Sequence, residues 1–234
     1  LGAGSMGAAF SFPCSDNNHS TSIIGTHLEN NFIDQINSSG KHPVLDCPIP
    51  QNVKFLKFEK FKEEANKKID LIVVAVISKG IEWASLEICK VIKNNIPILI
   101  LTKGLAINNN KYEVLAHKME RLLKEKGIKE INISAAGGPC LAKNLANKAH
   151  TSVVFANTDI KVAKKISKLV STNYYHVFTS DDVIGVETCA AIKNIFSMAV
   201  GASQGLCEST KSKEKNYLNT AAALIQESIY EMII

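Results

Sequence analysis

The sequence opens on LGAGSMG, and residues 2–7 of it, GAGSMG, fit the spacing G-x-G-x-x-G. In this pattern Gly2 permits a tight turn, and Gly4 lets backbone amides approach a pyrophosphate. Gly7 lets the following helix pack closely on a sheet, and the N-terminus of that helix attracts the anion. Plain turns between a strand and a helix can show the same spacing. Whether this loop binds a dinucleotide or is only a turn therefore depends on the order of the strands and helices that follow it.

Short β-branched segments alternate with longer amphipathic segments behind this loop. We expect strands at residues 21–25, 53–57, 71–77, 97–101, 130–134, 151–156 and 174–178, and helices at residues 28–38, 58–67, 81–93, 112–126 and 159–171. The runs LIVVAVI and IPILIL are continuously apolar, as strands of a parallel sheet covered on both faces are. This alternation predicts a doubly wound α/β fold of the Rossmann type, which favours a dinucleotide site over a plain turn.

The character of the sequence changes after the last predicted strand. Asp181 or Asp182 can cap a helix start, and only helical patterns follow, interrupted by the Lys-rich turn STKSKEK at residues 209–215. We therefore predict a dinucleotide-binding domain over residues 1–180 and the start of an all-helical domain over residues 181–234.

Two local features complicate this picture. The chain opens directly on the glycine loop and stops within a helical pattern, so we expect it to be a fragment of a longer protein. Pro13 falls past the first turn of the helix that should follow the loop. Because proline removes a backbone donor and clashes with the preceding turn, we expect it to shorten or kink that helix.

The composition favours a reduced, cytoplasmic protein. The net charge of +5 comes from lysine, because Arg121 is the only arginine, and no basic arm or aromatic–basic interleaving indicates a nucleic-acid partner. The six cysteines lack a CxxC pair and the six histidines lack ligand spacing, so we expect neither disulfides nor a metal site. The longest apolar runs are too short to cross a membrane, and no signal peptide is visible.

The residue that would hold the ribose of a dinucleotide is not at its usual place. An acidic residue usually ends the second strand of such a fold. Here that strand ends IIGTHLE, with Thr26 and His27 at the expected position and Glu29 a little later. The missing acid weakens the case for NAD, and no arginine is present to bind the 2′-phosphate of NADP, so both cofactors stay open.

A lysine–asparagine pair, Lys193 and Asn194, lies in the apolar stretch AIKNIFSMAVGASQG of residues 191–205. Glu187 is the only other charged residue between residues 183 and 205, and it is not three or four positions away. If this stretch is a buried helix, Lys193 therefore needs a partner in another segment or a ligand. A lysine held near a ketone oxygen can polarise it and supply a proton. The alternative is a surface lysine whose stem is buried and whose ammonium is solvated.

Four segments, in order, resemble the NAD(P)-dependent glycerol-3-phosphate dehydrogenases. They are GAGSMG, TKGL at residues 102–105, GGPCLAKNLA at residues 137–146 and DVIGVETCAAIKNIFSMAVGASQG at residues 182–205. NTAAALIQESIYEM, at residues 219–232, is similar to the next helix of that family. The resemblance implies a Rossmann domain followed by a helical domain, with catalysis between them. It also implies an oxidoreductase that interconverts sn-glycerol 3-phosphate and dihydroxyacetone phosphate with NAD or NADP, supplying phospholipid synthesis.

Carried over by position, the resemblance gives roles to individual residues. Lys193 matches the catalytic lysine, Asn194 its neighbour, and Lys103 a lysine that touches both cofactor and substrate. The expected cofactor-binding residues are Gly2, Gly4, Ser5, Met6, Gly7, His27, Lys103, Gly138 and Ala142, and the expected substrate-binding residues are Lys103, Gly138, Cys140 and Lys193. The family's substrate-anchoring arginine, in a Gly-Arg-Asn stretch, would lie beyond Ile234.

Three alternatives stay open. Ketopantoate reductases and β-hydroxyacid dehydrogenases also pair a Rossmann domain with a helical domain and use a lysine. A nucleotide-binding module without turnover would share the glycine loop, and a truncated product would have no function. We expect a small phosphorylated substrate, no nucleic acid, no membrane span, no metal, and a homodimer when the protein is full length.

Overall fold

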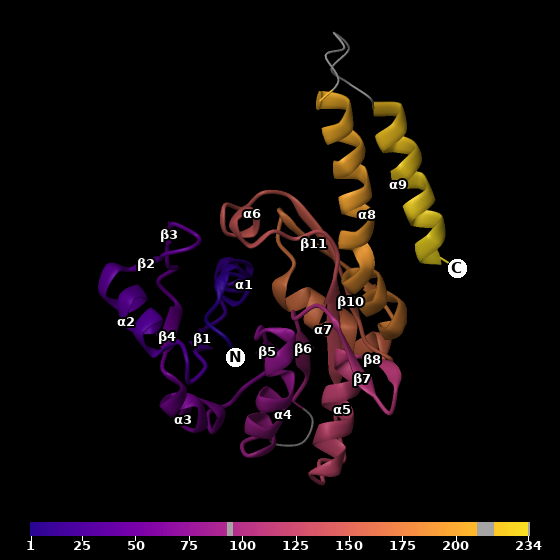
Figure 1. Ribbon diagram of the computed structural model, residues 1–234. Helices are drawn as coiled ribbons and strands as arrows, with labels where there is room; N and C mark the ends of the chain where they lie inside the picture. The colour runs from indigo at the N-terminus through magenta and orange to yellow at the C-terminus, as the bar shows by residue number, and fades with distance from the viewer. Residues whose placement is uncertain (93–95, 210–217, 234) are drawn as a thin grey trace. The chain divides into compact units, whose positions relative to one another are not determined.

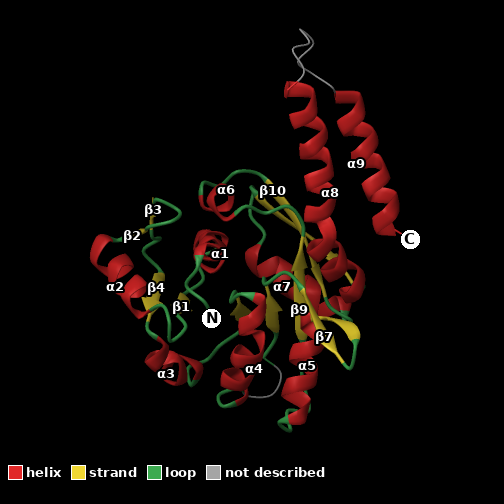
Figure 2. Ribbon diagram, viewed as in Figure 1, coloured by secondary structure: helices red, strands yellow, loops and turns green. Residues whose placement is uncertain are grey.

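The computed structural model describes residues 1–92, 96–209 and 218–233. It divides into two units, Leu1–Glu187 and Thr188–Ile234, and each is described by itself. Strands and helices alternate along the first unit, while the described part of the second is helical (Figures 1 and 2). Helix α8 (Val183–Ser209) runs through the division, so the domain boundary predicted near residue 180 stays a prediction.

The first unit is built on a twisted sheet. Five strands lie in the order β11-β10-β9-β6-β5, and their bounds are β5 Ile72–Val74, β6 Ile98–Ile100, β9 Ile133–Gly137, β10 Thr151–Ala156 and β11 Tyr175–Ser180. A separate parallel pair is formed by β1 (Thr21–Ile24) and β4 (Val53–Leu56).

The first two residues of the chain link these two sheets. The amide of Ala75 donates to the carbonyl of Leu1 over 2.8 Å, next to β5. The amide of Gly2 donates to the carbonyl of Ile24 over 2.8 Å, at the end of β1. The glycine loop therefore begins between the ends of β1 and β5.

Helices cover both faces of the sheet, which confirms the doubly wound fold. One face packs against α1 (Ser5–Asp16), α6 (Ala142–Ala146) and α7 (Ile160–Val170), and the other against α4 (Ile81–Cys89) and α5 (Leu115–Glu125). Side chains of β6 point alternately to the two faces of the sheet, so each face needs its own cover. Leu99 belongs to the core cluster on the first face, while Ile98 and Ile100 belong to the cluster on the second. Strands buried on both faces are mostly apolar, as β5 and β6 are here.

The direction of the strands changes once. β5 and β6 are parallel, as their apolar runs predict. β10 then pairs antiparallel with β9, with Val154 opposite Gly137, and β11 runs parallel to β10. The chain turns back at Gly138, whose φ is +113°. A Cβ atom there would lie 3.0 Å from the Cα of Val153, so the returning strand passes very close.

Several predicted elements differ from the structure. The helix expected at residues 112–126 begins only at Leu115, because the hairpin β7 (Leu105–Asn108) and β8 (Lys111–Val114) precedes it. Asn109 and Asn110 turn this hairpin with φ values of 50° and 60°, the left-handed conformation that two-residue turns require. The strand expected at residues 130–134 is β9, three residues later.

The remaining helices of this unit are α2 (Asn30–Ser39), the 3₁₀ turn η1 (Phe58–Lys60), α3 (Phe61–Ala65) and the 3₁₀ turn η2 (Ser78–Gly80). The short hairpin β2 (Lys41–His42) and β3 (Cys47–Pro48) follows α2. The helix expected at residues 58–67 is therefore a 3₁₀ turn followed by α3, and the helix expected at residues 81–93 ends at Cys89.

The prediction that Pro13 shortens α1 is wrong. The helix continues through Pro13 to Asp16, and Asn17 donates its amide to the Pro13 carbonyl over 3.2 Å. Pro13 stands in the last turn, where only one intrahelical bond is lost, and its ring is buried.

The second unit contains the rest of α8 and the helix α9 (Leu218–Ile233). The two helices touch where Cys189 Sγ lies 3.7 Å from the Met232 carbonyl oxygen. The Lys-rich turn predicted at residues 209–215 lies outside the described residues beyond Ser209. By length and composition alone, residues 183–206 of α8 could cross a bilayer, with a mean hydropathy of 1.4. This is weak evidence, because core helices of soluble proteins meet the same criterion.

Candidate active site

The three glycines of the loop have the geometry that a dinucleotide loop requires. Gly2 has a φ of +105°, and a Cβ atom there would lie 2.8 Å from the carbonyl oxygen of Ala75. A Cβ atom on Gly7 would lie 2.3 Å from the carbonyl oxygen of Gly2, so α1 leaves the loop at very close range. A Cβ atom on Gly4 would meet nothing within 4 Å, so this side of the loop is open to a ligand.

The N-terminus of α1 offers donors at the open side of the loop. Gly4 is the N-cap residue and provides no side-chain cap. The amides of the first turn, those of Ser5, Met6 and Gly7, cannot bond within the helix, and they carry the positive end of its dipole. An anionic group that rests on Gly4 would find these amides in front of it, so the loop fits a pyrophosphate.

The end of β1 carries an aromatic contact and an acidic one. His27 is exposed, and its ring lies edge-to-face on Trp83 of α4, with centroids 5.5 Å apart. Glu29 comes two residues later, and its carboxylate turns back to the glycine loop. Its Oε2 accepts from the amide of Thr26 over 2.6 Å and from the amide of Ala3 over 3.3 Å. An acid therefore does lie beside the loop, although the sequence places it late.

Lys103 and Gly138 come together at the carboxyl ends of β6 and β9. The Thr102 hydroxyl donates to the Val76 carbonyl over 2.6 Å, which holds the start of the TKGL segment against the end of β5. The exposed Lys103 then donates from Nζ to the Gly138 carbonyl over 3.0 Å. Two residues 35 positions apart in the sequence, both expected at the site, are therefore in direct contact.

Cys140 and Ala142 pack against the core on the side of the sheet that α1 covers. Both are partly buried against the core cluster that contains α1, and Met6 of the loop packs against the same cluster. Ala142 begins α6, which packs against α1. The segment after Gly138 is thereby connected to the helix that starts at the loop.

The first turn of α8 is anchored in the first unit. Asp182 caps the helix, because its Oδ1 accepts from the amide of Gly185 over 2.8 Å, as the sequence predicts. Gly137 leaves room for Val186, since a Cβ atom on Gly137 would lie 2.6 Å from Val186 Cγ1. The buried Glu187 accepts from the amide of Ala116 over 2.9 Å, at the start of α5.

Glu187 caps a helix that lacks a cap of its own. Val114, the N-cap residue of α5, provides no side-chain cap. Burial raises the pKa of Glu187 to about 7, and hydrogen bonds from the Ala116 and Leu115 amides oppose this rise only in part. Within the described residues its Oε1 has no hydrogen-bond partner. This carboxyl group therefore ties the first turns of α8 to α5.

Comparison with known proteins identifies the family. The family model for the NAD-dependent glycerol-3-phosphate dehydrogenase N-terminus matches residues 1–163, and that for its C-terminus matches residues 182–234. The chain belongs to the NAD-dependent glycerol-3-phosphate dehydrogenase family.

Individual relatives agree with this assignment. The chain is 28% identical over 232 residues to an NADP(+)-dependent glycerol-3-phosphate dehydrogenase of Archaeoglobus fulgidus. The matched region covers 99% of this chain and 67% of that protein. It is 30% identical over 206 residues to a glycerol-3-phosphate dehydrogenase [NAD(P)+] of Streptococcus agalactiae, covering 88% of this chain and 59% of that protein. The chain thus spans about three fifths to two thirds of the length of these relatives.

Solved structures of glycerol-3-phosphate dehydrogenases share the fold. The structure from Coxiella burnetii is 24% identical with a TM-score of 0.77, covering 99% of this chain and 66% of that one. The structure from Plasmodium falciparum is 21% identical with a TM-score of 0.80, covering 100% of this chain and 63% of that one. The Rossmann-type architecture inferred from the sequence is confirmed.

In this member of the glycerol-3-phosphate dehydrogenase family, Lys193 and Asn194 belong to the second unit. Lys193 is half-buried on α8 and Asn194 is exposed. The structure brings together the loop glycines with Ser5 and Met6, and separately Lys103 with Gly138, while the roles of Lys193 and Asn194 stay predictions. Among the described residues, no group of three or more His, Cys, Asp or Glu side chains could hold a metal ion.

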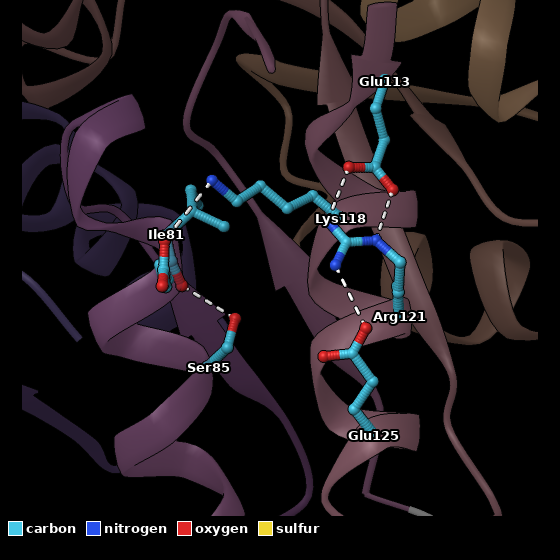
Figure 3. Close-up of polar contacts among 7 residues, drawn as sticks. Ile81, Ser85, Glu113, Lys118, Arg121 and Glu125 are labelled. Atoms are coloured by element: carbon cyan, nitrogen blue, oxygen red, sulfur yellow. Dashed lines mark hydrogen bonds and ion pairs between the residues drawn. The ribbon is translucent and has the colours of Figure 1, made fainter. Parts of the chain in front are cut away.

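The only arginine of this chain forms ion pairs within the fold. Arg121 of α5 donates from Nε and Nη2 to both carboxylate oxygens of Glu113, over 3.0 and 2.9 Å, and from Nη1 to Glu125 over 3.2 Å (Figure 3). The guanidinium beside it holds the pKa of Glu113 below its usual value. Because this sequence has no second arginine, a cationic side chain that contacts a phosphorylated ligand within it would be a lysine or a histidine.

Proposed function

We propose that the protein interconverts sn-glycerol 3-phosphate and dihydroxyacetone phosphate by hydride transfer with NAD or NADP. The contact between Lys103 Nζ and the Gly138 carbonyl carries this proposal. It gives a cation at the carboxyl edge of the sheet, where the open glycine loop also lies, and ligands of doubly wound folds bind at this edge. The names of the relatives support the same reaction.

The residues of the loop fit the cofactor. The amides of Ser5, Met6 and Gly7 would hold the pyrophosphate above Gly4, and the aromatic pair of His27 and Trp83 would accept the adenine end. Gly138, Ala142 and Lys103 would line the other end. When bound, the dinucleotide supplies or accepts the hydride.

Lys193 would move the proton of the reaction. In the direction of reduction, its ammonium group donates a proton to the ketone oxygen of the substrate, and the resulting amine is reprotonated from solvent. In the direction of oxidation, the amine takes the proton of the hydroxyl group. Asn194 would orient the substrate beside Lys193.

Lys103 would supply a positive charge for the substrate phosphate. Its ammonium group is already directed to Gly138, so the phosphate would be received beside that carbonyl. Cys140, in the same segment, would line the substrate site together with Gly138. A lysine is a point charge without the planar fork of arginine, so this contact attracts the phosphate more than it orients it.

We also propose a cytoplasmic homodimer that does not span a membrane and that supplies phospholipid synthesis. The family model for the C-terminus includes α8 as part of a protein domain, which supports a helix packed against protein rather than lipid. Glu187 and Lys193 lie within the apolar stretch of α8, where each would be costly in a bilayer. Cys14, Cys47, Cys89 and Cys189 are free thiols, which suits a reducing compartment.

The decisive experiment follows the absorbance of NADH, and then of NADPH, when dihydroxyacetone phosphate is added to the full-length protein. Rapid oxidation of either cofactor is the expected result. Ketopantoate and a 3-oxoacid serve as competing substrates. Oxidation with one of these alone, or cofactor binding without any oxidation, would contradict the proposal. Binding is measured independently by energy transfer from Trp83, the only tryptophan, to the reduced nicotinamide.

A further inference from the structure

His42 is a fully buried histidine that the proposed reaction does not use. It lies in the short hairpin of β2 and β3, and its side chain has an exposed fraction of 0%. Its ring packs edge-to-face on Phe32, with centroids 5.1 Å apart, and near Phe55 at 6.3 Å. A polar ring in such an apolar place needs a partner for each nitrogen.

Both ring nitrogens of His42 have such partners. Nε2 lies 3.2 Å from the carbonyl oxygen of Ala3, and the amide of Leu45 donates to Nδ1 over 3.2 Å. Only the neutral tautomer with its proton on Nε2 satisfies both contacts, because Nδ1 must accept while Nε2 donates. Burial lowers the pKa of His42, which favours this neutral form, although the nearby Glu29 carboxylate acts in the opposite direction.

The contact with Ala3 places His42 directly on the glycine loop. Ala3 stands between Gly2 and Gly4 and is completely buried. Its amide donates to Glu29 and its carbonyl accepts from His42, so side chains 26 and 39 residues away hold both of its peptide groups. Both groups are therefore already engaged by side chains of this chain. The donors left for a phosphate are the amides that follow Gly4, and their direction depends on how Ala3 is held.

We propose that His42 is a positioning residue of the dinucleotide-binding loop, which holds the Ala3 carbonyl and thereby aims the first-turn amides of α1 at the pyrophosphate. The inference rests on the proposed function only in taking an NAD-type dinucleotide as the ligand. A histidine that merely filled the core would be replaced by any residue of similar volume. A positioning histidine is replaced only by a side chain that reaches Ala3.

Two amide variants separate these roles. The side chain of His42→Gln can place a donor where Nε2 lies, and so reaches Ala3. The shorter side chain of His42→Asn can place an acceptor where Nδ1 lies, and so keeps Leu45 but leaves Ala3 unpaired. An unpaired buried carbonyl loosens the loop, and we expect His42→Asn to bind NADH and NADPH about 10- to 100-fold more weakly than wild type. His42→Gln should stay within about 3-fold.

Dissociation constants are measured by energy transfer from Trp83, together with thermal unfolding of each variant. Phe32→Leu is the matched control, because it removes packing against the His42 ring and leaves both hydrogen-bond partners of that ring in place. It should lower the melting temperature and leave both dissociation constants unchanged. Equal affinities in the Asn and Gln variants, or weakened binding in Phe32→Leu, would overturn the proposal.

Hydrogen exchange separates this inference from the proposed function. If the wild-type protein bound neither cofactor, the function would fail. The amides of Ala3 and Ala8, which donate to Glu29 and to the Gly4 carbonyl, would still report on the loop through their exchange rates. Faster exchange of these amides in His42→Asn, with wild-type exchange in His42→Gln, is the expected result. Identical exchange in the two variants would refute the role of His42, whichever ligand the loop binds.

Discussion

Replacing Gly7 by alanine tests whether dinucleotide binding requires the close approach of α1 to the glycine loop. The new Cβ atom would lie 2.3 Å from the carbonyl oxygen of Gly2 and 3.2 Å from the Cβ of Ala75. Because such contacts do not fall below 3.0 Å in proteins, the first turn of α1 must move by about 0.7 Å. The contacted oxygen belongs to the backbone, so no side-chain rotation relieves the clash.

The expected effect on affinity exceeds the effect on stability. Overpacking at Gly7 should destabilise the fold by about 1–3 kcal/mol, and the higher helix propensity of alanine should offset about 1 kcal/mol of this loss. The free energy of unfolding should therefore fall by about 0–2 kcal/mol. A hydrogen bond to a charged phosphate contributes about 1.5–3 kcal/mol, so one misaligned amide should weaken binding by about 10- to 150-fold.

The assay combines thermal unfolding with titration of NADH and NADPH, followed by energy transfer from Trp83. Gly4→Ala is the first comparison, because its Cβ atom meets no protein atom within 4 Å. It should keep the wild-type stability within about 1 kcal/mol and still lose affinity, since the methyl group occupies the space of the pyrophosphate. Gly201→Ala, on an exposed part of α8, should raise stability by about 1 kcal/mol without changing affinity.

Wild-type affinity in Gly7→Ala would refute this reasoning, because the first-turn amides would then not need their present position. Wild-type affinity in Gly4→Ala would be equally damaging, since it would show that no ligand rests on the open side of the loop. A loss of affinity in Gly201→Ala would indicate a global effect instead of a local one.

Three further outcomes are expected. Glu187→Gln should flatten the dependence of the free energy of unfolding on pH. Because the folded-state pKa of Glu187 is raised to about 7, the protonated group stabilises the fold fully below about pH 4.5, and this stabilisation, on the order of 3 kcal/mol, is lost as the pH rises through about 7. Unfolding measured at about pH 5 and about pH 8 would detect the difference. Lys193→Met should lower kcat by about 100-fold or more at unchanged NADH affinity, whereas Lys103→Met should mainly raise KM for the phosphorylated substrate; equal loss of cofactor binding in both would contradict these roles. Phe155→Ala, at a fully buried position, should cost about 3–5 kcal/mol in denaturant unfolding, and Phe178→Ala, 63% exposed, should cost far less; similar losses would show that the core is misplaced.

Much of the fold could be predicted from local patterns. The apolar runs of β5 and β6 and the alternation of strands and helices indicated a sheet covered on both faces, which the two core clusters confirm. The β7–β8 hairpin was missed because its Asn109–Asn110 turn interrupts a segment with helical periodicity. The reversal at β10 depends on a close passage at Gly138, which no spacing in the sequence reveals.

The candidate site was predictable only where a motif is local. The glycine loop has the turn, open side and close packing that its spacing predicts. Glu29, His42 and Glu187 act instead through contacts with partners that lie 26, 39 and 71 residues away. A single sequence does not show which distant backbone groups a buried side chain will reach, although a buried histidine or glutamate signals that such partners exist.

The ion pairs of Arg121 have a consequence for chemical labelling. Because both Glu113 and Glu125 bind the only guanidinium group of the sequence, an arginine-directed dicarbonyl reagent has one target, and that target joins β8 to α5. Acylation of lysines would instead remove the cations that remain available to a phosphate ester. In this chain, two reagents therefore distinguish the cation that supports the architecture from those that attract ligands.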